Sequence, residues 1–239
     1  MRNTIVLDWL KEWICPDKCM ICSMFLEENL PECICNSCEE GLLIRDVCPR
    51  CGKPYSIKGD PCLYCYEMPP QVTRILALFP YIDLYKESVL RWKYTGMRKY
   101  ARGYGILMAN TLIRSQQLEI DCLIPIPIAR HRYLDRGFNQ AYDLATEVSK
   151  HTQIPVWDVL ERSRDTKPQS ACKKEERLKN IYGAIKVKDE VSFEGPIKIA
   201  FVDDIYTTGS TIRECIRVLK AIENIEIEAI YVLTVCLAI

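Results

Sequence analysis

The sequence lacks an excess of charge of either sign. Its 239 residues carry 32 basic and 32 acidic side chains, which gives a formal net charge of zero. That balance excludes a strongly cationic protein of the kind that coats nucleic acid indiscriminately. Apolar residues make up 49% and charged residues 27% of the chain, a mix typical of a soluble globular protein with a substantial core and not of a disordered chain.

Long apolar runs are also missing. No stretch longer than 11 residues is free of charge, so no segment is expected to cross a membrane as a helix. The first residues include Asp8, Lys11 and Glu12, where a signal peptide needs an unbroken apolar core. The sequence therefore favours a cytoplasmic protein that is not exported.

Cysteine, in contrast, is abundant and unevenly placed. Ten of the 14 cysteines fall between Cys15 and Cys65. Two residues between cysteines let both thiolates face one ion, and two such pairs complete a tetrahedral S₄ site. Four pairs with this spacing predict two closed, structural Zn²⁺ sites. The eight predicted ligands are Cys19, Cys22, Cys35, Cys38, Cys48, Cys51, Cys62 and Cys65.

Several features of this cysteine-rich segment stay open at the level of sequence. The pairs can combine in chain order or crossed, and Cys15 or Cys33 could replace a neighbouring ligand. Iron–sulfur clusters also use four cysteines, whereas disulfides are uncommon in the cytoplasm. Zinc modules of this size often exist simply to fold, because metal binding substitutes for a core. A structural or docking role and a role in nucleic-acid contact both fit.

The chain divides into two parts of different character. Residues 1–68 are rich in cysteine, proline and short polar turns and are expected to form a small zinc-binding module, whereas residues 69–239 alternate strands with helices. Such alternation predicts an α/β fold with a mainly parallel sheet flanked by helices. Strands are expected at 74–82, 121–126, 155–160, 197–202 and 227–237, helices at 84–94, 99–114, 139–151 and 209–223, and a polar loop leading into a helix at 162–179.

The most informative stretch is V-D-D-I-Y-T-T-G-S-T at residues 202–211. A buried strand is expected to end in the two acids, and a turn of small hydroxyl residues then opens a helix. The backbone N–H groups of such a turn, together with the helix dipole, form a phosphate site, and the acids could accept hydrogen bonds from a sugar. An ordinary helix cap needs only one such polar residue. The candidate binding residues are Asp203, Asp204, Thr207, Thr208, Gly209, Ser210 and Thr211.

The same stretch resembles the phosphoribosyl-pyrophosphate (PRPP) loop of type I phosphoribosyltransferases, and two further blocks resemble the ComF family. The first is I-P-I-P at 124–127 followed by R-G-F-N-Q at 136–140. The second is R-D-T-K-P-Q at 164–169 followed by Glu176, Arg177 and Asn180. Paired cysteines ahead of these blocks also resemble that family, so the resemblance covers nearly the whole chain.

This resemblance implies a type I phosphoribosyltransferase-like fold in which the two acids hold the ribose hydroxyls of PRPP and the turn holds its 5′-phosphate. Mg²⁺ would accompany the pyrophosphate. The family is associated with natural transformation, the uptake of single-stranded DNA at the inner face of the membrane, which implies DNA-uptake proteins as partners at that face. The implied pyrophosphate site and closing flap comprise Pro125, Ile126, Arg130, Arg132, Arg136, Arg164, Lys167 and Arg177.

A second basic group runs through the two helices expected at 84–94 and 99–114. Its cations alternate with Trp92, Tyr94, Tyr100 and Tyr104, a mixture that suits single-stranded nucleic acid because rings stack on bases while cations follow phosphates. The alternative is a pair of amphipathic helices that bury these rings in the core. The candidate nucleic-acid contacts are Lys93, Arg98, Lys99 and Arg102.

Two functions fit these residues. One is a binding module that keeps PRPP binding, contacts single-stranded DNA and acts in DNA uptake. The other is an enzyme of nucleotide metabolism that transfers the phosphoribosyl group of PRPP to an acceptor, although no residue presents itself as the base that would activate an acceptor. The sequence favours the first function and leaves turnover of PRPP open.

Overall fold

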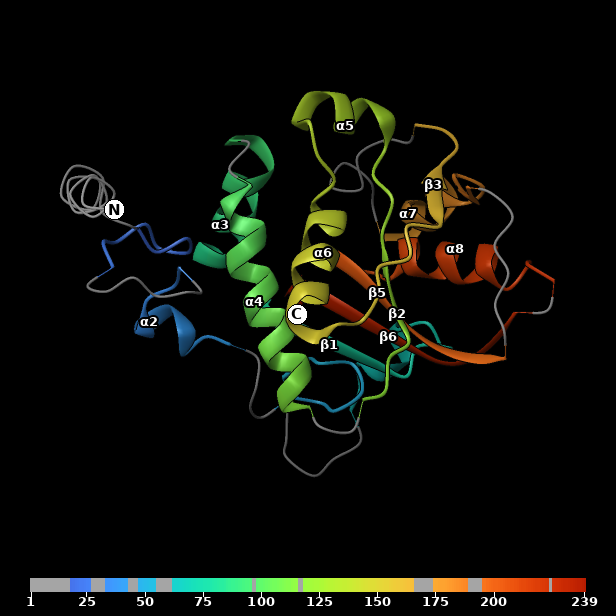
Figure 1. Ribbon diagram of the computed structural model, residues 1–239, viewed down its shortest axis with the longest axis horizontal. Helices are drawn as coiled ribbons and strands as arrows, with labels where there is room; N and C mark the ends of the chain where they lie inside the picture. Colours follow the sequence, from blue (N-terminus) through green and yellow to red (C-terminus); the bar gives the residue numbers. More distant parts are fainter. Residues whose placement is uncertain are drawn as a thin grey trace, which may run out of the picture.

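The computed structural model describes residues 18–26, 33–42, 47–54, 62–95, 98–115, 118–165, 174–188, 195–223 and 225–239. A parallel sheet lies between two layers of helices (Figure 1). The expectations for Cys15 and Lys167 lie outside the described residues. No helix in the described ranges is long and apolar enough to cross a membrane.

The sheet of the described chain has four strands, all of them parallel. Their order is β1 (Arg74–Pro80), β6 (Glu226–Leu237), β5 (Pro196–Tyr206) and β2 (Cys122–Pro125). Because parallel strands share one direction, all four carboxyl ends meet at one edge, which is where ligands of open α/β sheets bind. The predicted α/β class with a mainly parallel sheet flanked by helices is confirmed.

Strand alternation builds two cores, one on each face of the sheet. On β5, Ala200 and Val202 face one core while Ile199 and Phe201 face the other, as expected when successive side chains point to opposite faces. The first core is covered by α3 (Asp83–Thr95), α4 (Lys99–Arg114) and α6 (Gln140–Thr152). The second is covered by α8 (Ser210–Leu219), α7 (Lys174–Ile181), β3 (Leu160–Arg162) and β4 (Ile185–Val187).

The two cysteine-rich loops pack against different parts of this sheet. The first loop buries Met20 and Ile21 in the core beneath α3 and α4, and the Met20 carbonyl accepts hydrogen bonds from Ser88 and Arg91 of α3. The second loop extends the edge of β1, because the Ile75 N–H donates to the Arg50 carbonyl at 2.8 Å. The expected division of the chain at residue 68 stays a prediction.

Three local expectations differ from the structure. The strand expected to end before the acids continues through them to Tyr206, because β6 goes on pairing with β5 beyond the end of β2. In place of a strand at 155–160 there is a single bridge from Val156 to Leu123, and β3 begins only at Leu160. Several short elements were not expected, among them α5 (Arg130–Arg136), α2 (Asn36–Glu39) and β4.

Candidate functional site: a cleft at the carboxyl edge and two four-cysteine clusters

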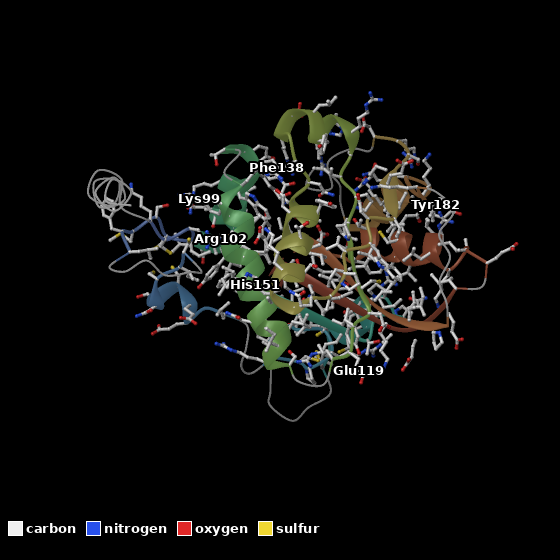
Figure 2. The ribbon with its side chains drawn as sticks, viewed as in Figure 1. Lys99, Arg102, Glu119, Phe138, His151 and Tyr182 are labelled. Carbon is white, nitrogen blue, oxygen red and sulfur yellow. The ribbon has the colours of Figure 1, made fainter. Side chains whose placement is uncertain are left out.

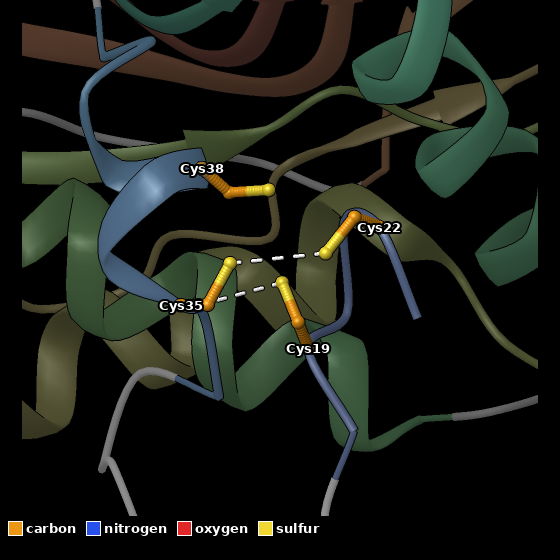
Figure 3. A group of neighbouring side chains, drawn as sticks. All are labelled: Cys19, Cys22, Cys35 and Cys38. Carbon is orange, nitrogen blue, oxygen red and sulfur yellow. Dashed lines mark hydrogen bonds between the residues drawn. The ribbon is translucent and has the colours of Figure 1, made fainter. Parts of the chain in front are cut away.

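The eight predicted cysteine ligands form two groups of four, in chain order. In each group the Sγ atoms all lie within 4.8 Å of one another. A Zn²⁺ tetrahedron with bonds of about 2.3 Å has edges of roughly 3.8 Å between sulfur atoms, so both groups are close to the size of a closed site. In Figure 3 the four sulfur atoms of the first group face one another, with Cys22 and Cys35 at 3.7 Å. The second group is Cys48, Cys51, Cys62 and Cys65.

Backbone N–H groups lower the pKa of one cysteine in each cluster, Cys19 and Cys48, and so favour the thiolate form that metals bind. Burial by itself would raise the pKa of Cys48, but hydrogen bonds from the backbone of Cys51 and Arg50 outweigh it, and the pKa falls to about 7. In the first group the Cys35 N–H points at the Cys19 sulfur at 3.4 Å. Cys33 belongs to neither group of four, and its carbonyl accepts the Met20 N–H. The clusters can therefore hold metal ions with the eight predicted ligands alone.

A cleft of about 820 Å³ opens at the carboxyl edge of the sheet. Its walls come from the end of β5, the turn after it, the segment from Ile126 to Arg136, the end of α3 and the start of α6. Predicted residues that line it include Asp203, Asp204, Thr207, Thr211, Ile126, Arg132 and Arg136. The fold therefore brings the predicted phosphate turn and part of the predicted pyrophosphate segment to one cavity.

The two acids are adjacent on β5 but face different neighbours. Asp204 forms an ion pair of 2.9 Å with Lys93 of α3, and both side chains are largely shielded from solvent. Asp203 accepts the backbone N–H of Asp204 at 2.8 Å and lies near the guanidinium of Arg162. Burial and the neighbouring Asp204 charge raise the pKa of Asp203 to about 7, against the opposing effect of Lys93. This carboxyl therefore titrates near neutral pH.

The turn after β5 places two hydroxyl residues on the cleft and turns two others toward each other. Thr207 and Thr211 line the cavity. Thr208 Oγ1 and Ser210 Oγ lie 2.7 Å apart, so this pair shapes the turn. Gly209 caps α8 with φ at 70°, a left-handed conformation that glycine adopts without strain. The predicted turn thus leads into the N-terminus of α8, where no side chain caps the backbone N–H groups in the described structure, and such groups can bind an anion.

Gly209 also lies too close to its neighbours to carry a side chain. A Cβ there would be 2.4 Å from the Tyr206 hydroxyl and 3.1 Å from Pro69 Cδ. Gly137 has a similar φ of 78°, with nothing within 4 Å of its Cβ position among the described residues. We expect Gly137→Ala to cost about 1 kcal/mol from φ alone and Gly209→Ala at least twice that. Urea unfolding with equal m-values measures both, and equal losses would contradict the packing argument.

The other predicted anion-site residues have different surroundings. Pro125 ends β2, and Arg130 is exposed at the start of α5. Arg164 donates to the carbonyls of Asn180 and Tyr182, which link it to the end of α7 and the residue after it. For Arg177, the helix α7 is described but the side chain is not.

Most aromatic rings of the basic helices α3 and α4 are not available for stacking on bases. Trp92, Tyr100 and Tyr104 are buried in the first core, which agrees with the alternative of amphipathic helices, and only Tyr94 of the four is exposed. Lys93 pairs with Asp204 and Arg98 pairs with Asp143 at 2.7 Å. Lys99 and Arg102 are exposed on α4 (Figure 2). These last two remain the cations available to a nucleic acid.

Lys93, Arg162 and Gln140 line the cleft, but none of them was assigned to it from sequence. Lys93 was assigned to nucleic acid, and its pairing with Asp204 spans 111 residues of chain. Arg162 donates to the Pro127 carbonyl and lies beside Asp203. Gln140 lines the cleft almost fully buried. No local pattern marks such residues, because only the tertiary fold brings them together; the R-G-F-N-Q block was the one available signal for Gln140.

The fold and the site define the class of protein. It is an α/β protein with a cleft at the carboxyl edge of a parallel sheet, and the N-terminal part of its chain forms two four-cysteine clusters. No family model matches the chain. Among solved structures it is similar to the UMP synthase of Leishmania donovani, with 17% identity, a TM-score of 0.33 and coverage of 56% of this chain and 22% of that one. A purine phosphoribosyltransferase from Pyrococcus horikoshii gives 17% identity, a TM-score of 0.27 and coverage of 56% and 82%.

Curated relatives are more similar. Competence protein ComFC of Bacillus subtilis is 31% identical over 196 residues, which cover 79% of this chain and 78% of that protein. Competence protein F of Haemophilus influenzae is 26% identical, with coverage of 82% and 87%. The DNA utilization protein YhgH of Salmonella typhimurium is 29% identical, with coverage of 85% and 91%. The chain belongs to the ComF family of competence proteins, which confirms the resemblance seen in the sequence.

Proposed function

We propose that this ComF-family protein binds PRPP with Mg²⁺ and acts in DNA uptake during natural transformation. The observation that carries the proposal is the cleft itself, which combines two acids, an anion-binding turn and basic side chains in one cavity. Asp203, Asp204, Thr207 and Thr211 all line this cavity. In our proposal the two acids accept hydrogen bonds from the ribose hydroxyls, and the two threonines bind the 5′-phosphate. Arg132 supplies positive charge on the opposite segment for the pyrophosphate.

Zn²⁺ is the metal we propose for the two four-cysteine clusters, because four thiolates at tetrahedral spacing are typical of structural zinc sites. Mg²⁺ would enter with PRPP, since this ion is usually held by substrate phosphates together with one or two carboxylates. Asp203 and Asp204 are the carboxylates on the cleft that fit this role. The bound ion would neutralise charge on the pyrophosphate.

The test of PRPP binding is calorimetry with PRPP and Mg²⁺. Wild-type protein should bind, and Asp203→Ala/Asp204→Ala should bind at least 100-fold more weakly, because the ribose hydroxyls lose both acceptors. Glu226→Gln, at the exposed start of β6 and at the opposite edge of the sheet, is the matched control and should bind like wild type. Lack of binding by wild type, or equal affinity in the double variant, would contradict the proposal.

Active transfer from PRPP is the alternative function. The C1–O bond to pyrophosphate would break, a bond from C1 to the acceptor would form, and pyrophosphate would leave with the electron pair. Pyrophosphate release in the presence of candidate acceptors measures this reaction. Release that depends on one acceptor and is lost in Asp203→Ala/Asp204→Ala would favour the enzyme, and no release with any acceptor would favour the binding module.

Single-stranded DNA is the second ligand of the proposal, and the exposed cations of α4 support it. We expect Lys99→Glu and Arg102→Glu each to weaken binding of an oligonucleotide several-fold, and log affinity to fall steeply with log salt because each phosphate contact releases counterions. Lys220→Glu makes the same charge change at the exposed end of α8, on the other face of the sheet. Fluorescence anisotropy measures all three. If the α4 variants match Lys220→Glu, this helix does not contact DNA.

A further inference from the structure

A contact between two side chains joins the basic side of the cleft to the segment that follows β3. His131 belongs to α5 and lines the cleft, and its Nδ1 atom lies 2.9 Å from the Oδ1 atom of Asp165. Asp165 comes three residues after the end of β3. The proposed function places the pyrophosphate of PRPP on this same side of the cleft. Asp165 therefore brings a negative charge to the place where another negative group is proposed to bind.

The carboxylate of Asp165 is held as an anion by donors at the start of α5. A hydrogen bond from the His131 side chain is the main cause that lowers the pKa of Asp165. Hydrogen bonds from the backbone of His131 and of Arg130 lower it further, against a smaller effect of desolvation. Because an ionised carboxylate can only accept hydrogen bonds, His131 Nδ1 is the donor of this pair. The side chain of Asp165 thus takes up donors that an external anion could use.

The chain that leads to Asp165 is anchored on both sides. Arg162 of β3 donates to the Pro127 carbonyl at 3.3 Å, which ties the strand to the segment before α5. Arg164 donates to the Tyr182 carbonyl at 2.8 Å, beyond the end of α7. The contact of Asp165 with α5 is therefore the continuation of a series of hydrogen bonds, and its position at the cleft follows from the position of β3.

The other charges on this side of the cleft are mainly positive. Three arginine side chains line it, namely Arg132, Arg136 and Arg162. Asp135 also lines the cleft, from an exposed position on α5. Carboxylates and phosphate groups accept charge-assisted hydrogen bonds from the same kinds of donor. Asp165 and a pyrophosphate group would consequently compete for His131 and the N–H groups beside it.

We propose that Asp165 is an internal competitor of pyrophosphate, which occupies His131 and the adjoining N–H groups in the empty protein and leaves them when PRPP binds. The proposal rests on the proposed function for the position of the pyrophosphate, and it adds a regulation of the same site. Apparent affinity falls in proportion to the fraction of molecules that are competent to bind. Because the contact is partly exposed to solvent and exposed pairs are weak, a ligand with several negative charges can displace the carboxylate.

The test compares wild type with Asp165→Asn, which keeps the shape of the side chain and removes its charge. Pyrophosphate with Mg²⁺ and PRPP with Mg²⁺ are titrated into each protein by calorimetry. We expect Asp165→Asn to bind both ligands about fivefold more tightly, since more of the protein is then competent. Ribose 5-phosphate lacks the pyrophosphate and should bind both proteins equally. If Asp165 instead contacted the bound ligand or its Mg²⁺, the variant would bind more weakly, so the direction of the change separates the two roles.

Asp135→Asn is the matched control, because it removes the same charge from an exposed position on the same side of the cleft. It should strengthen pyrophosphate binding less than twofold. His131→Ala tests the contact itself. In that background the main donor to the carboxylate is gone, so adding Asp165→Asn should strengthen pyrophosphate binding less than twofold, as a double-mutant cycle detects for residues that act through each other.

The outcomes separate the competitor from the proposed function. Equal or weaker pyrophosphate binding by Asp165→Asn overturns the competitor, even when PRPP binds wild type. An equal gain in Asp135→Asn, or a fivefold gain that persists beside His131→Ala, also overturns it, because charge alone would then explain the effect. If Asp165→Asn binds pyrophosphate more tightly as expected but neither protein binds PRPP, the competitor stands and the proposed function fails. If neither ligand binds either protein, both fail.

Discussion

Replacing Cys51 by serine should remove one of two zinc ions and lower the melting temperature by on the order of 10 °C. The sulfur atom of Cys51 is buried within the second four-cysteine cluster. Structural zinc contributes its binding free energy to folding, and a loss of several kcal/mol shifts the melting temperature of a chain this size by about that amount. The loss should reach the sheet, because the Arg50 carbonyl in the same knuckle pairs with Ile75 of β1.

Metal content by mass spectrometry and thermal unfolding by circular dichroism measure this effect. Wild type should carry two zinc ions per chain, and Cys51→Ser should carry one. Cys33→Ser is the matched control, since Cys33 is close to the first cluster but belongs to neither, and it should keep both ions. Iron in place of zinc, one metal in wild type, or metal loss in Cys33→Ser would contradict the assignment of the ligands.

Each cluster is linked to a different wall of the cleft, so loss of a ligand from one cluster should have a different effect from loss of a ligand from the other. The second knuckle continues to Glu67, whose carbonyl accepts a hydrogen bond from Arg213 of α8 at 2.9 Å, next to the turn at Gly209. The first knuckle holds α3 through Ser88 and Arg91, and α3 carries the Lys93 that pairs with Asp204. Cys51→Ser should therefore disturb the phosphate turn, and Cys22→Ser should disturb the Lys93 side.

How much the sequence could predict depends on how local each feature is. The cysteine pairs and the acid–turn stretch are local motifs, so their residues were identified from sequence and the structure brings each set together. Which pairs share a metal was not determined by spacing, because both combinations join cysteines over short loops. The chain-order pairing follows from packing, in which the first two pairs belong to the core on one face of the sheet and the last two pairs to the core on the other face.

Elements without a hydrophobic pattern were the ones missed. The helix α5 has the sequence RHRYLDR and buries none of its residues, so no apolar periodicity marks it. The strands β3 and β4 have three residues each and pair with each other outside the main sheet. Asp203 and Asp204 were expected at the end of a strand, but strand pairing with β6 continues through them to Tyr206. Their ionisation depends on Lys93 and Arg162, which only the tertiary structure brings close.

That environment leads to the second large effect: Asp203→Asn should stabilise the empty protein above pH 7, and it should weaken PRPP binding less than the double alanine variant does. Burial and the Asp204 charge raise the pKa of Asp203 to about 7, whereas an unfolded aspartate has a pKa of about 3.9. The folded protein thus retains a proton that the unfolded chain releases. The stabilisation that protonated Asp203 contributes to the folded state is complete below pH 4. It falls as the pH rises from about 4 to about 7, and it stays low above that.

Asparagine keeps the shape of the side chain and the acceptor for the Asp204 N–H, but it does not ionise. The free energy of unfolding of Asp203→Asn should therefore lack this decline, and above pH 7 it should exceed that of wild type by on the order of 2–4 kcal/mol. Urea unfolding from pH 4 to pH 8 measures the difference. Asp158→Asn, an exposed aspartate paired with Lys188, is the control and should change stability by less than about 1 kcal/mol. If the free energy of unfolding has the same pH dependence in wild type and Asp203→Asn, ionisation of Asp203 does not destabilise the folded protein. The pKa of this carboxyl would then not be raised as the structure indicates.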